Sequence, residues 1–306
     1  MPKLNASKLV RQGFAVASHP AATPSCSVNQ IKQSRSELAA PNPLTTSNDT
    51  IMEFAGCFLR IFDEGDPGPL PLAPIDSLNI DDAYRVQDAV LELRKFRGET
   101  VVGYKVGCTS RAIREQFGLQ TPIFGRLLKP HIYPNGSILQ LSNFTSCALE
   151  PEFVFHIGRD IRVHDIDDDA LLKSIEFISP GLEVHNYRFW FERPTSQELI
   201  ASNGIHACLV IGDDKREPNS VGLTDQEVAL LIDDELQGVG RGADIMDGGP
   251  LLSLRELVKF LVSRGDYLRA GQYVIPGSPV RLIPAMSGTI ARATLAQIGS
   301  VEARFI

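Results

Sequence analysis

Residues 149–156 read LEPEFVFH, and this stretch decides how the rest of the chain is interpreted. Side chains two residues apart on a strand share a face, so Glu150 and Glu152 point one way while Phe153 and Phe155 point into apolar surroundings. Neighbouring carboxylates repel each other unless they are solvated or a cation lies between them. The stretch therefore predicts either an ordinary solvent-facing strand or a site for a hard divalent cation such as Mg²⁺ or Mn²⁺, which prefers carboxylate oxygen.

Two further charged residues lie inside apolar segments with the composition of strands. Glu183 lies in PGLEVH at 180–185, and Lys105 lies in GYKVG at 103–107. A lone carboxylate in such a strand is usually exposed, and a lysine side chain usually extends to the surface. The alternative is that Glu183 supplies a third oxygen to the cation, and that the ammonium group of Lys105 faces an anionic substrate or a developing enolate.

Two glycine-containing segments are candidates for ligand binding. The segment GVGRGAD at 238–244 matches neither the dinucleotide fingerprint nor a Walker A loop. We expect a turn between hairpin strands there, whose backbone amides, including that of Gly242, could line a pocket. The segment PGSP at 276–279 predicts a tight turn, through which Gly277 and Ser278 could present amide and hydroxyl donors to a carboxylate.

Cysteine and histidine patterns exclude several kinds of site. The five cysteines are scattered without a Cys-x-x-Cys pair, which predicts reduced thiols and no structural zinc. Cys108 follows the Lys105 segment and is a weak candidate nucleophile, since no histidine stands near it in sequence. None of the six histidines has a paired metal-binding spacing, so each is expected to be structural or on the surface. A serine hydrolase has no support, because no Gly-x-Ser-x-Gly elbow is present.

Composition bounds the class of protein. Of the 306 residues, 43% are hydrophobic and 22% are charged, as in an ordinary globular protein. The formal net charge of −7 argues against binding to nucleic acid or to an anionic membrane surface. No apolar run approaches the roughly 18 to 20 residues that a transmembrane helix needs.

The secondary-structure pattern is mostly strands, with few helices. We expect a helix from Asn79 to Phe96 capped by Asp81 or Asp82, a short helix from Thr109 or Ser110 to Gly118, and a helix that starts at a Ser253–Glu256 capping box and stops at Gly265. Strands are predicted at 101–106, 148–157, 181–185, 207–212, 273–275, 289–295 and 300–305. Because these strands do not alternate with helices, the pattern favours a mixed or mostly antiparallel α+β fold over a doubly wound sheet or a TIM barrel.

The chain divides into three predicted regions. Residues 1–50 are rich in Ser, Ala, Pro, Thr and Asn, with no acidic residue before Glu37, so we expect a disordered extension, a transit-like segment or a misassigned start. Residues 51–100 are expected to form a helical region packed on a catalytic domain at 101–306. A cytoplasmic location is expected, or the mitochondrial matrix if the extension is a transit peptide.

An ordered set of segments resembles the fumarylacetoacetate hydrolase superfamily, in particular its branch of 2-keto-4-pentenoate hydratases and 4-oxalocrotonate decarboxylases. The resemblance covers about 83–305. It is specific because the segments occur in family order: Asp82-Ala83-Tyr84 with Gln87, Gly103 to Gly107, Pro122 to Gly125, the Glu150 and Glu152 pair, Gly181 to Val184, Ala201 to Gly204, Gly240 to Ala243, and Ile298 to Val301.

The resemblance implies a mixed β-roll with peripheral helices and a Mg²⁺ or Mn²⁺ ion held by Glu150, Glu152 and Glu183. It also implies 2-oxo acid substrates, a metal-stabilised enolate and a homo-oligomer, with Lys105 close to the bound acid. A hydratase acting on a substrate such as 2-keto-4-pentenoate is the first expectation. The alternatives are a 4-oxalocrotonate-type decarboxylase, a C–C bond hydrolase of an acylpyruvate, and a non-catalytic ligand-binding member.

Two positions depart from the family pattern. Hydratases of the branch that this chain resembles share an acidic residue at the position of Ile123. Its absence here favours decarboxylation or another substrate over hydration. The segment MDGGP at 246–250 also differs from the pattern that it resembles, and its Asp247 is a further candidate for proton transfer.

Overall fold

The structure is a computed structural model that describes residues 46–66, 68–186 and 194–306. These residues lie within one unit that spans Thr45–Ile306. The expectations for residues 1–45, including the transit-like segment, fall outside the described residues, and so do Cys26 and His19. The predicted division into 51–100 and 101–306 stays a prediction. Among the described residues, no helix is both long enough and apolar enough to cross a membrane.

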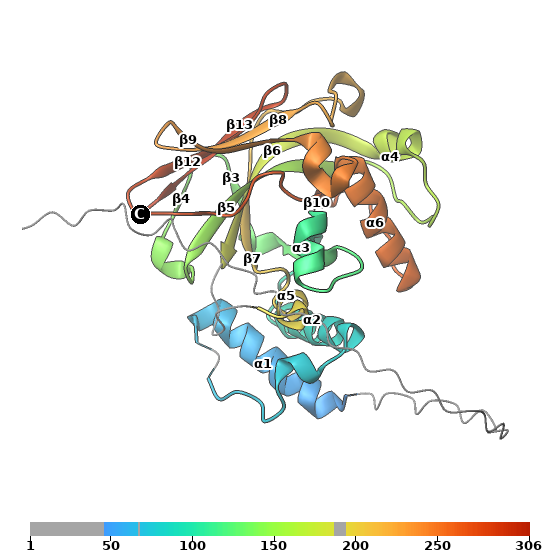
Figure 1. Cartoon of the computed structure of the whole chain (residues 1–306), viewed down its shortest axis with the longest axis vertical. Coiled ribbons are helices and arrows are strands. Elements are labelled where there is room, and N and C mark those ends of the chain that lie inside the picture. The colour runs from blue at the N-terminus through green and yellow to red at the C-terminus, as the bar shows by residue number, and fades with distance from the viewer. Residues whose placement is uncertain (1–45, 67, 187–193) are drawn as a thin grey trace, which may run out of the picture. The chain divides into compact units, whose positions relative to one another are not determined.

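Two sheets form the body of the protein (Figure 1). The first sheet has the strand order β2-β1-β10-β5-β6-β7-β3, with β11 also paired to β5. Its strands are β1 Val101–Gly107, β2 Ile123–Leu128, β3 Ile132–Pro134, β5 Cys147–Ile157, β6 Ile175–Asn186, β7 His206–Ile211, β10 Tyr273–Ile275 and β11 Ile283–Pro284. The second sheet has the order β4-β13-β12-β8-β9. Its strands are β4 Ser137–Leu139, β8 Glu227–Ile232, β9 Glu235–Arg241, β12 Ile290–Leu295 and β13 Gly299–Phe305.

The first sheet curls so that its distant strands meet. Leu127 of β2, Val154 of β5, Leu209 of β7 and Ile275 of β10 form one buried apolar cluster, although β2 and β7 lie far apart in the strand order. Their side chains therefore face a common interior. The register places Glu150, Glu152 and the cross-strand partner Glu183 on this same face, because they alternate in phase with Val154.

The outer face of the first sheet packs in two places. Leu149 joins Leu182, Leu230 and Phe305 in the apolar layer between the two sheets. Farther along β5, the side chains of Phe153 and Phe155 pack in the core that also contains residues of α4, Asp168–Ser174, and α6, Pro250–Ser263. The alternation predicted for residues 149–156 is confirmed by this arrangement.

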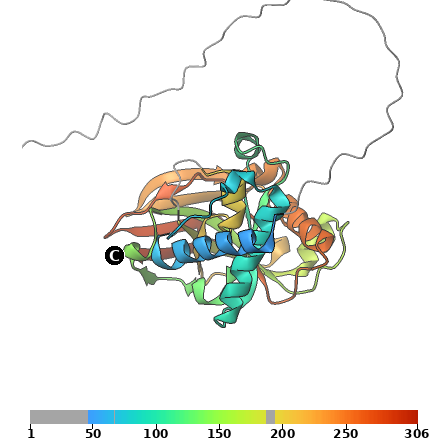
Figure 2. The same cartoon turned by 90° about the horizontal axis from the view of Figure 1, so that it is seen from below.

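Helices cover one end of the roll. The helices α1, Asn48–Glu64, and α2, Ile80–Phe96, cross each other there, with α5, Ser196–Ala201, between them and the strands (Figures 1 and 2). Phe54 and Phe58 of α1 meet Val86 of α2 and Ala201 in one apolar cluster. The short α3, Arg111–Gln116, follows β1, as predicted.

Three local predictions are wrong. Asn79, rather than Asp81 or Asp82, caps α2, because its side chain accepts the Asp82 amide N–H at 2.7 Å. Ser253 does not form a capping box with Glu256: α6 begins at Pro250 after Gly249, and the Ser253 hydroxyl donates to the carbonyl of Pro276.

The third wrong prediction is the turn at 238–244. Gly238 and Gly240 lie on β9, and the hairpin turn is formed by Asp233 and Asp234, both with positive φ. The glycines of β9 are required by close packing, since a Cβ atom at Gly240 would lie 2.6 Å from the carbonyl oxygen of Pro279. Closeness to another segment, not turn formation, explains these glycines.

Candidate active site

Three strands bring the predicted charged residues together inside the roll. Lys105 comes from β1, Glu150 and Glu152 from β5, and Glu183 from β6, directly opposite Glu150 in the β5–β6 register. The exposed fractions of Lys105, Glu152 and Glu183 are 3%, 1% and 0%. The alternatives of a lysine that extends to the surface and of glutamates that face solvent are therefore wrong for these three residues. The side chain of Glu150 is 21% exposed.

Lys105 is held by a carboxylate and a carbonyl. Its Nζ lies 3.1 Å from Oε1 of Glu183 and donates to the carbonyl of Gly204 at 3.0 Å. Burial alone would lower the pKa of Lys105, but the charges of Glu183 and Glu150 reverse that effect and raise it. Gly125 leaves room for the lysine, because a Cβ atom there would lie 2.9 Å from Cγ of Lys105.

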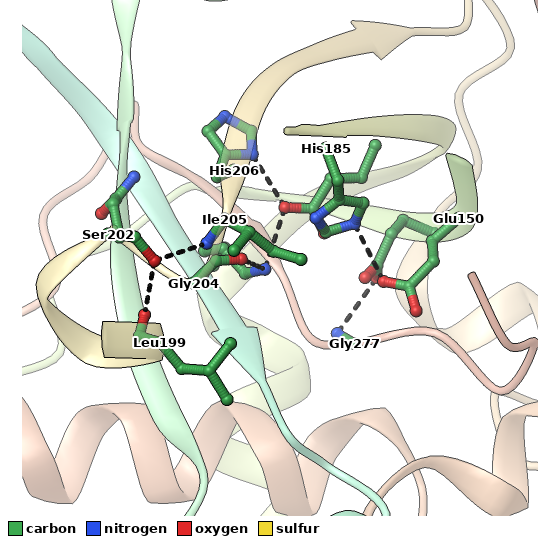
Figure 3. Close-up of polar contacts among 12 residues, drawn as sticks. Glu150, His185, Leu199, Ser202, Gly204, Ile205, His206 and Gly277 are labelled. Atoms are coloured by element: carbon green, nitrogen blue, oxygen red, sulfur yellow. Dashed lines mark hydrogen bonds and ion pairs between the residues drawn. The ribbon is translucent and has the colours of Figure 1, made fainter. Parts of the chain in front are cut away.

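Two buried histidines flank Glu183. His185 lies two residues farther along β6 and shares the interior face. Its Nε2 is 3.1 Å from Oε2 of Glu150 (Figure 3). The same nitrogen is 3.3 Å from Oε2 of Glu183. His206, at the start of β7, lies with Nδ1 2.8 Å from Oε1 of Glu183. The pairing of β6 with β7 is irregular next to His185, and this bulge aligns His206 with His185.

Neither histidine was predicted from the sequence to be part of the site. Their partners are on other strands or on the same strand two residues away, so no short histidine motif marks them. The one available signal was the alternation within residues 180–185, which places His185 on the face of Glu183.

Glu152 has a different environment from the other two acids. Its Oε2 accepts the amide N–H of Gly277 at 3.0 Å, while its Oε1 is buried without a hydrogen-bond partner in the described ranges. Burial, followed by the charges of Glu183 and Glu150, raises the pKa of Glu152 well above its ordinary value. The Gly277 amide, expected to face a substrate carboxylate, here donates to a protein carboxylate, and any role toward a substrate stays a prediction.

The charges of the cluster are coupled. Burial alone would raise the pKa of Glu183, but His185 and Lys105 hold it well below its ordinary value. Burial alone would lower the pKa of His185, but Glu183 and Glu150 raise it to about 9. Burial lowers the pKa of His206, so this imidazole is neutral, and its Nδ1–H group donates a hydrogen bond to Glu183. Glu183 is therefore an ionised carboxylate between one neutral and two cationic groups.

The donor set fits a divalent cation. One ligand atom each from Glu150, Glu183 and His185 can be chosen so that all lie within 4.8 Å of one another. In the part of the chain that the structure describes, Oε1 of Glu152 has no hydrogen-bond partner, and Oε2 of Glu183 has none beyond its ion pair with Nε2 of His185 at 3.3 Å. Buried carboxylate oxygens of this kind are costly unless a cation or proton satisfies them. The predicted ligand set of Glu150, Glu152 and Glu183 stays a prediction, and His185 is an addition to it.

Cys108 is not activated as a nucleophile. Burial raises the pKa of its thiol to about 11, and the positive charge of Lys105 only partly offsets this. At neutral pH the group is a thiol, which reacts far more slowly than a thiolate. Like Cys57, Cys147 and Cys208, it is a free cysteine.

The remaining candidates lie around the cluster. Asp247 is exposed and lines a cavity with Arg111 and Arg114 of α3. Gly242 is buried, and a Cβ atom there would lie 1.9 Å from the carbonyl oxygen of Leu223, so close packing requires this glycine. The Ser278 hydroxyl accepts the Val280 amide N–H at 3.1 Å. Catalytic or binding roles for these residues stay predictions.

Ile123 is part of the wall beside Lys105. It is 3% exposed, and its Cδ1 lies 3.5 Å from the position that a Cβ atom would take at Gly204, whose carbonyl binds the lysine. The position that departs from the family pattern therefore contributes an apolar surface next to the ammonium group.

The chain is similar in sequence to curated bacterial enzymes. It is 26% identical over 239 residues to the 2-keto-4-pentenoate hydratase of Paraburkholderia xenovorans, a match that covers 77% of this chain and 88% of the relative. It is 27% identical over 225 residues to the 4-oxalocrotonate decarboxylase of a Pseudomonas species, with 74% and 85% covered. No family model matches the chain. These relatives give the mitochondrial alternative no support.

The fold is shared with a solved structure. The 4-oxalocrotonate decarboxylase of Pseudomonas putida, complexed with magnesium and adipate, matches with a TM-score of 0.80 at 24% identity, covering 86% of this chain and 99% of the other. The predicted α+β roll is confirmed. The predicted resemblance to the hydratase and decarboxylase branch is confirmed by the sequence matches.

Proposed function

We propose that this chain, a relative of 2-keto-4-pentenoate hydratases and 4-oxalocrotonate decarboxylases, is a divalent-metal-dependent lyase. Its substrate would be a 2-hydroxydienoic acid such as 2-hydroxypenta-2,4-dienoate, to which it adds water. The observation that carries the proposal is the meeting of Glu150, Glu183 and Lys105 from three strands inside one roll, with Lys105 and Glu183 almost fully buried. The names of the sequence relatives, and the magnesium in the related decarboxylase structure, support it.

Glu150 and Glu183 would hold the cation, and Glu152 can contribute its unpartnered Oε1. A divalent cation bound there supplies Lewis-acid polarisation of a 2-oxo group and stabilises the negative charge that develops on it. Which metal is bound belongs to the proposal, as does assembly into a homo-oligomer.

Lys105 has two roles in this proposal. Its ammonium group neutralises Glu183 and keeps that carboxylate ionised, and it adds positive charge where an anionic substrate would lie. Since its Nζ is also fixed by the carbonyl of Gly204, the charge is positioned before substrate arrives.

Decarboxylation of a 2-oxo enedioic acid such as 4-oxalocrotonate is the second candidate function, and a specific observation favours it. Ile123 offers an apolar surface beside Lys105. Loss of CO₂ needs an electron acceptor at the 2-oxo end, whereas water addition needs a group that moves protons, which Ile123 cannot do. The 2-oxo group of the substrate would accept the electron pair that CO₂ leaves behind, and the positive charge of the site would stabilise the enolate that forms.

The test is turnover of 2-hydroxypenta-2,4-dienoate and of 4-oxalocrotonate with Mg²⁺ or Mn²⁺ supplied. Loss of dienol absorbance with gain of water mass supports hydration, and release of CO₂ supports decarboxylation. Glu183→Gln should abolish either reaction, while Glu176→Gln, an exposed glutamate on the same strand, should leave it intact. Absence of both reactions in the metal-loaded protein would refute the proposal.

A further inference from the structure

We propose that Nε2 of His185 binds the metal directly, together with oxygens of Glu150 and Glu183, and that the proton which Nε2 carries in the metal-free protein is released to solvent as the ion binds. The centre is then a mixed nitrogen–oxygen site that selects a transition-metal ion such as Mn²⁺, Co²⁺ or Zn²⁺ over Mg²⁺. This inference deepens the proposed function and rests on it, because it concerns the metal of the same site.

The distances fit adjacent ligands of one ion. Neighbouring ligands in an octahedral or tetrahedral shell with bonds of about 2.0 to 2.2 Å are roughly 2.8 to 3.6 Å apart. Nε2 of His185 lies 3.1 Å from Oε2 of Glu150 and 3.3 Å from Oε2 of Glu183. Each of the three residues offers a ligand atom within 4.8 Å of the other two, so one ion can reach all of them.

The backbone fixes this arrangement. Glu150 and Glu183 are cross-strand partners, and His185 shares the face of Glu183 because it is two residues away on β6. His185 is 2% exposed, so protein atoms surround its ring and the ring does not face solvent. Its Nδ1 has no hydrogen-bond partner in the described residues, and its polar contacts there are made by Nε2 with the two acids.

In both Glu183 and Glu152, protein groups bind one carboxylate oxygen and leave the other available to a metal ion. Oε1 of Glu183 is bound by Lys105 and His206, which leaves Oε2 on the side of His185. Oε2 of Glu152 is bound by the Gly277 amide, which leaves Oε1. The protein contacts therefore orient one free oxygen of each of these acids.

The ligand chemistry decides the type of metal. Mg²⁺ favours all-oxygen ligands and octahedral geometry, whereas imidazole nitrogen suits first-row transition metals and Zn²⁺. Replacing one oxygen by nitrogen shifts the preference of the site toward the latter. The opposing possibility is that His185 is only an ion-pair partner of the acids and is displaced when a metal binds.

The experiment compares wild-type protein with His185→Gln, each saturated with Mn²⁺ or Co²⁺, by pulsed electron paramagnetic resonance. We expect nitrogen hyperfine coupling in the wild type, a change in that coupling when histidine is isotopically labelled, and its loss in His185→Gln. His206→Gln is the matched control, because His206 is also buried and contacts Glu183, and it should retain the coupling.

Calorimetric titration gives a second measurement. In His185→Gln, the affinity for Co²⁺ should fall by more than about 100-fold, beyond the range expected for an outer-shell residue, while the affinity for Mg²⁺ falls much less. If the wild-type protein binds the metal but shows no nitrogen coupling, the inference is overturned. This outcome does not depend on whether His185→Gln folds. An equal loss of affinity for Co²⁺ and Mg²⁺ in His185→Gln would also contradict the inference.

The outcomes separate this inference from the proposed function. Metal binding through oxygen alone with intact turnover removes His185 as a ligand and leaves the lyase proposal standing. Nitrogen coupling without turnover of either acid supports the mixed centre and removes the lyase proposal. Failure of the wild-type protein to bind any of these metals overturns both.

Discussion

Nδ1 of His206 lies 2.8 Å from Oε1 of Glu183, and this contact joins β7 to the charged cluster inside the roll. The irregular pairing of β6 with β7 places His206 beside His185. Because burial lowers the pKa of His206, the neutral ring donates a hydrogen bond rather than adding a third positive charge. The contact therefore orients Glu183 without changing the charge of the site.

Replacing His206 tests this positioning role. His206→Leu removes the hydrogen bond, and we expect it to weaken divalent-metal affinity by about 10- to 100-fold, the range for a residue that orients a ligand. His206→Gln, which keeps an amide donor, should lose less. Titration calorimetry with Mn²⁺ measures both, and equal affinity in the wild type and His206→Leu would contradict the role.

Lys105 acts on the reaction more than on metal binding. Lys105→Met keeps the length of the side chain but removes the charge beside Glu183 and the hydrogen bond to Gly204. We expect kcat to fall by about 100-fold or more, as for loss of a preorganised charge, with a smaller change in metal affinity.

The control for Lys105 is Lys95→Met, which removes an exposed lysine that pairs with Glu92 on α2. It should leave kcat and metal affinity unchanged. If Lys105→Met retained full kcat, the lysine would have no part in the chemistry. If it lost metal affinity as strongly as kcat, its effect would be on the site's assembly.

The charged core of the site could be predicted because strand geometry is local. Alternation within residues 149–156 is enough to place Glu150 and Glu152 on one face, and the same rule applies to Glu183. The convergence of these acids was expected from the family resemblance, since no spacing within the sequence relates β5 to β6. Their common face then follows from the register of Glu150 with Glu183.

The parts that could not be predicted depend on non-local packing. His206 lies 23 residues from Glu183, and a bulge brings it there. Gly240 resembled a turn residue, but its absent side chain makes room for Pro279 from another segment. Ser253 resembled a helix cap, yet Pro250 begins the helix earlier, and the serine hydroxyl bonds to Pro276. In each case a distant contact decides between two local alternatives.

Gly277 is a position where any side chain should be costly. Its φ is +106°, and a Cβ atom there would lie 2.5 Å from Cγ2 of Thr109, while its amide binds Glu152. We expect Gly277→Ala to reduce the free energy of unfolding by about 2 to 4 kcal/mol, from backbone strain plus overpacking. The variant should also bind metal less tightly, since the Glu152 contact would be disturbed.

Gly271→Ala is the control for strain alone. Gly271 has φ of +83° but no atom within 4 Å of an added Cβ. Its substitution should reduce the free energy of unfolding by about 1 to 2 kcal/mol, without altering metal affinity. Urea unfolding measures both variants, and equal losses would show that the contact with Thr109 has no energetic effect.

His131 makes the stability of the fold depend on pH. Arg94 of α2 donates to its Nε2 at 2.6 Å, Glu99 lies 3.5 Å from the same nitrogen, and its ring meets Phe62 of α1 edge-on. Burial, followed by the charge of Arg94, lowers the pKa of His131 to about 4 despite Glu99. Since Nε2 must accept from Arg94, the ring is neutral in the folded protein.

The sign of the effect follows from proton counting. Between about pH 6.5 and pH 4, His131 binds a proton in the unfolded chain but not in the folded one, so the free energy of unfolding falls as the pH is lowered through this range. His131→Gln keeps an acceptor for Arg94 and cannot titrate. Urea unfolding at pH 7 and pH 4 should therefore show a loss that is larger in the wild type than in His131→Gln by about 2 to 3 kcal/mol. Parallel pH profiles for the two proteins would show that His131 titrates normally, and that its contact with Arg94 does not hold the ring neutral.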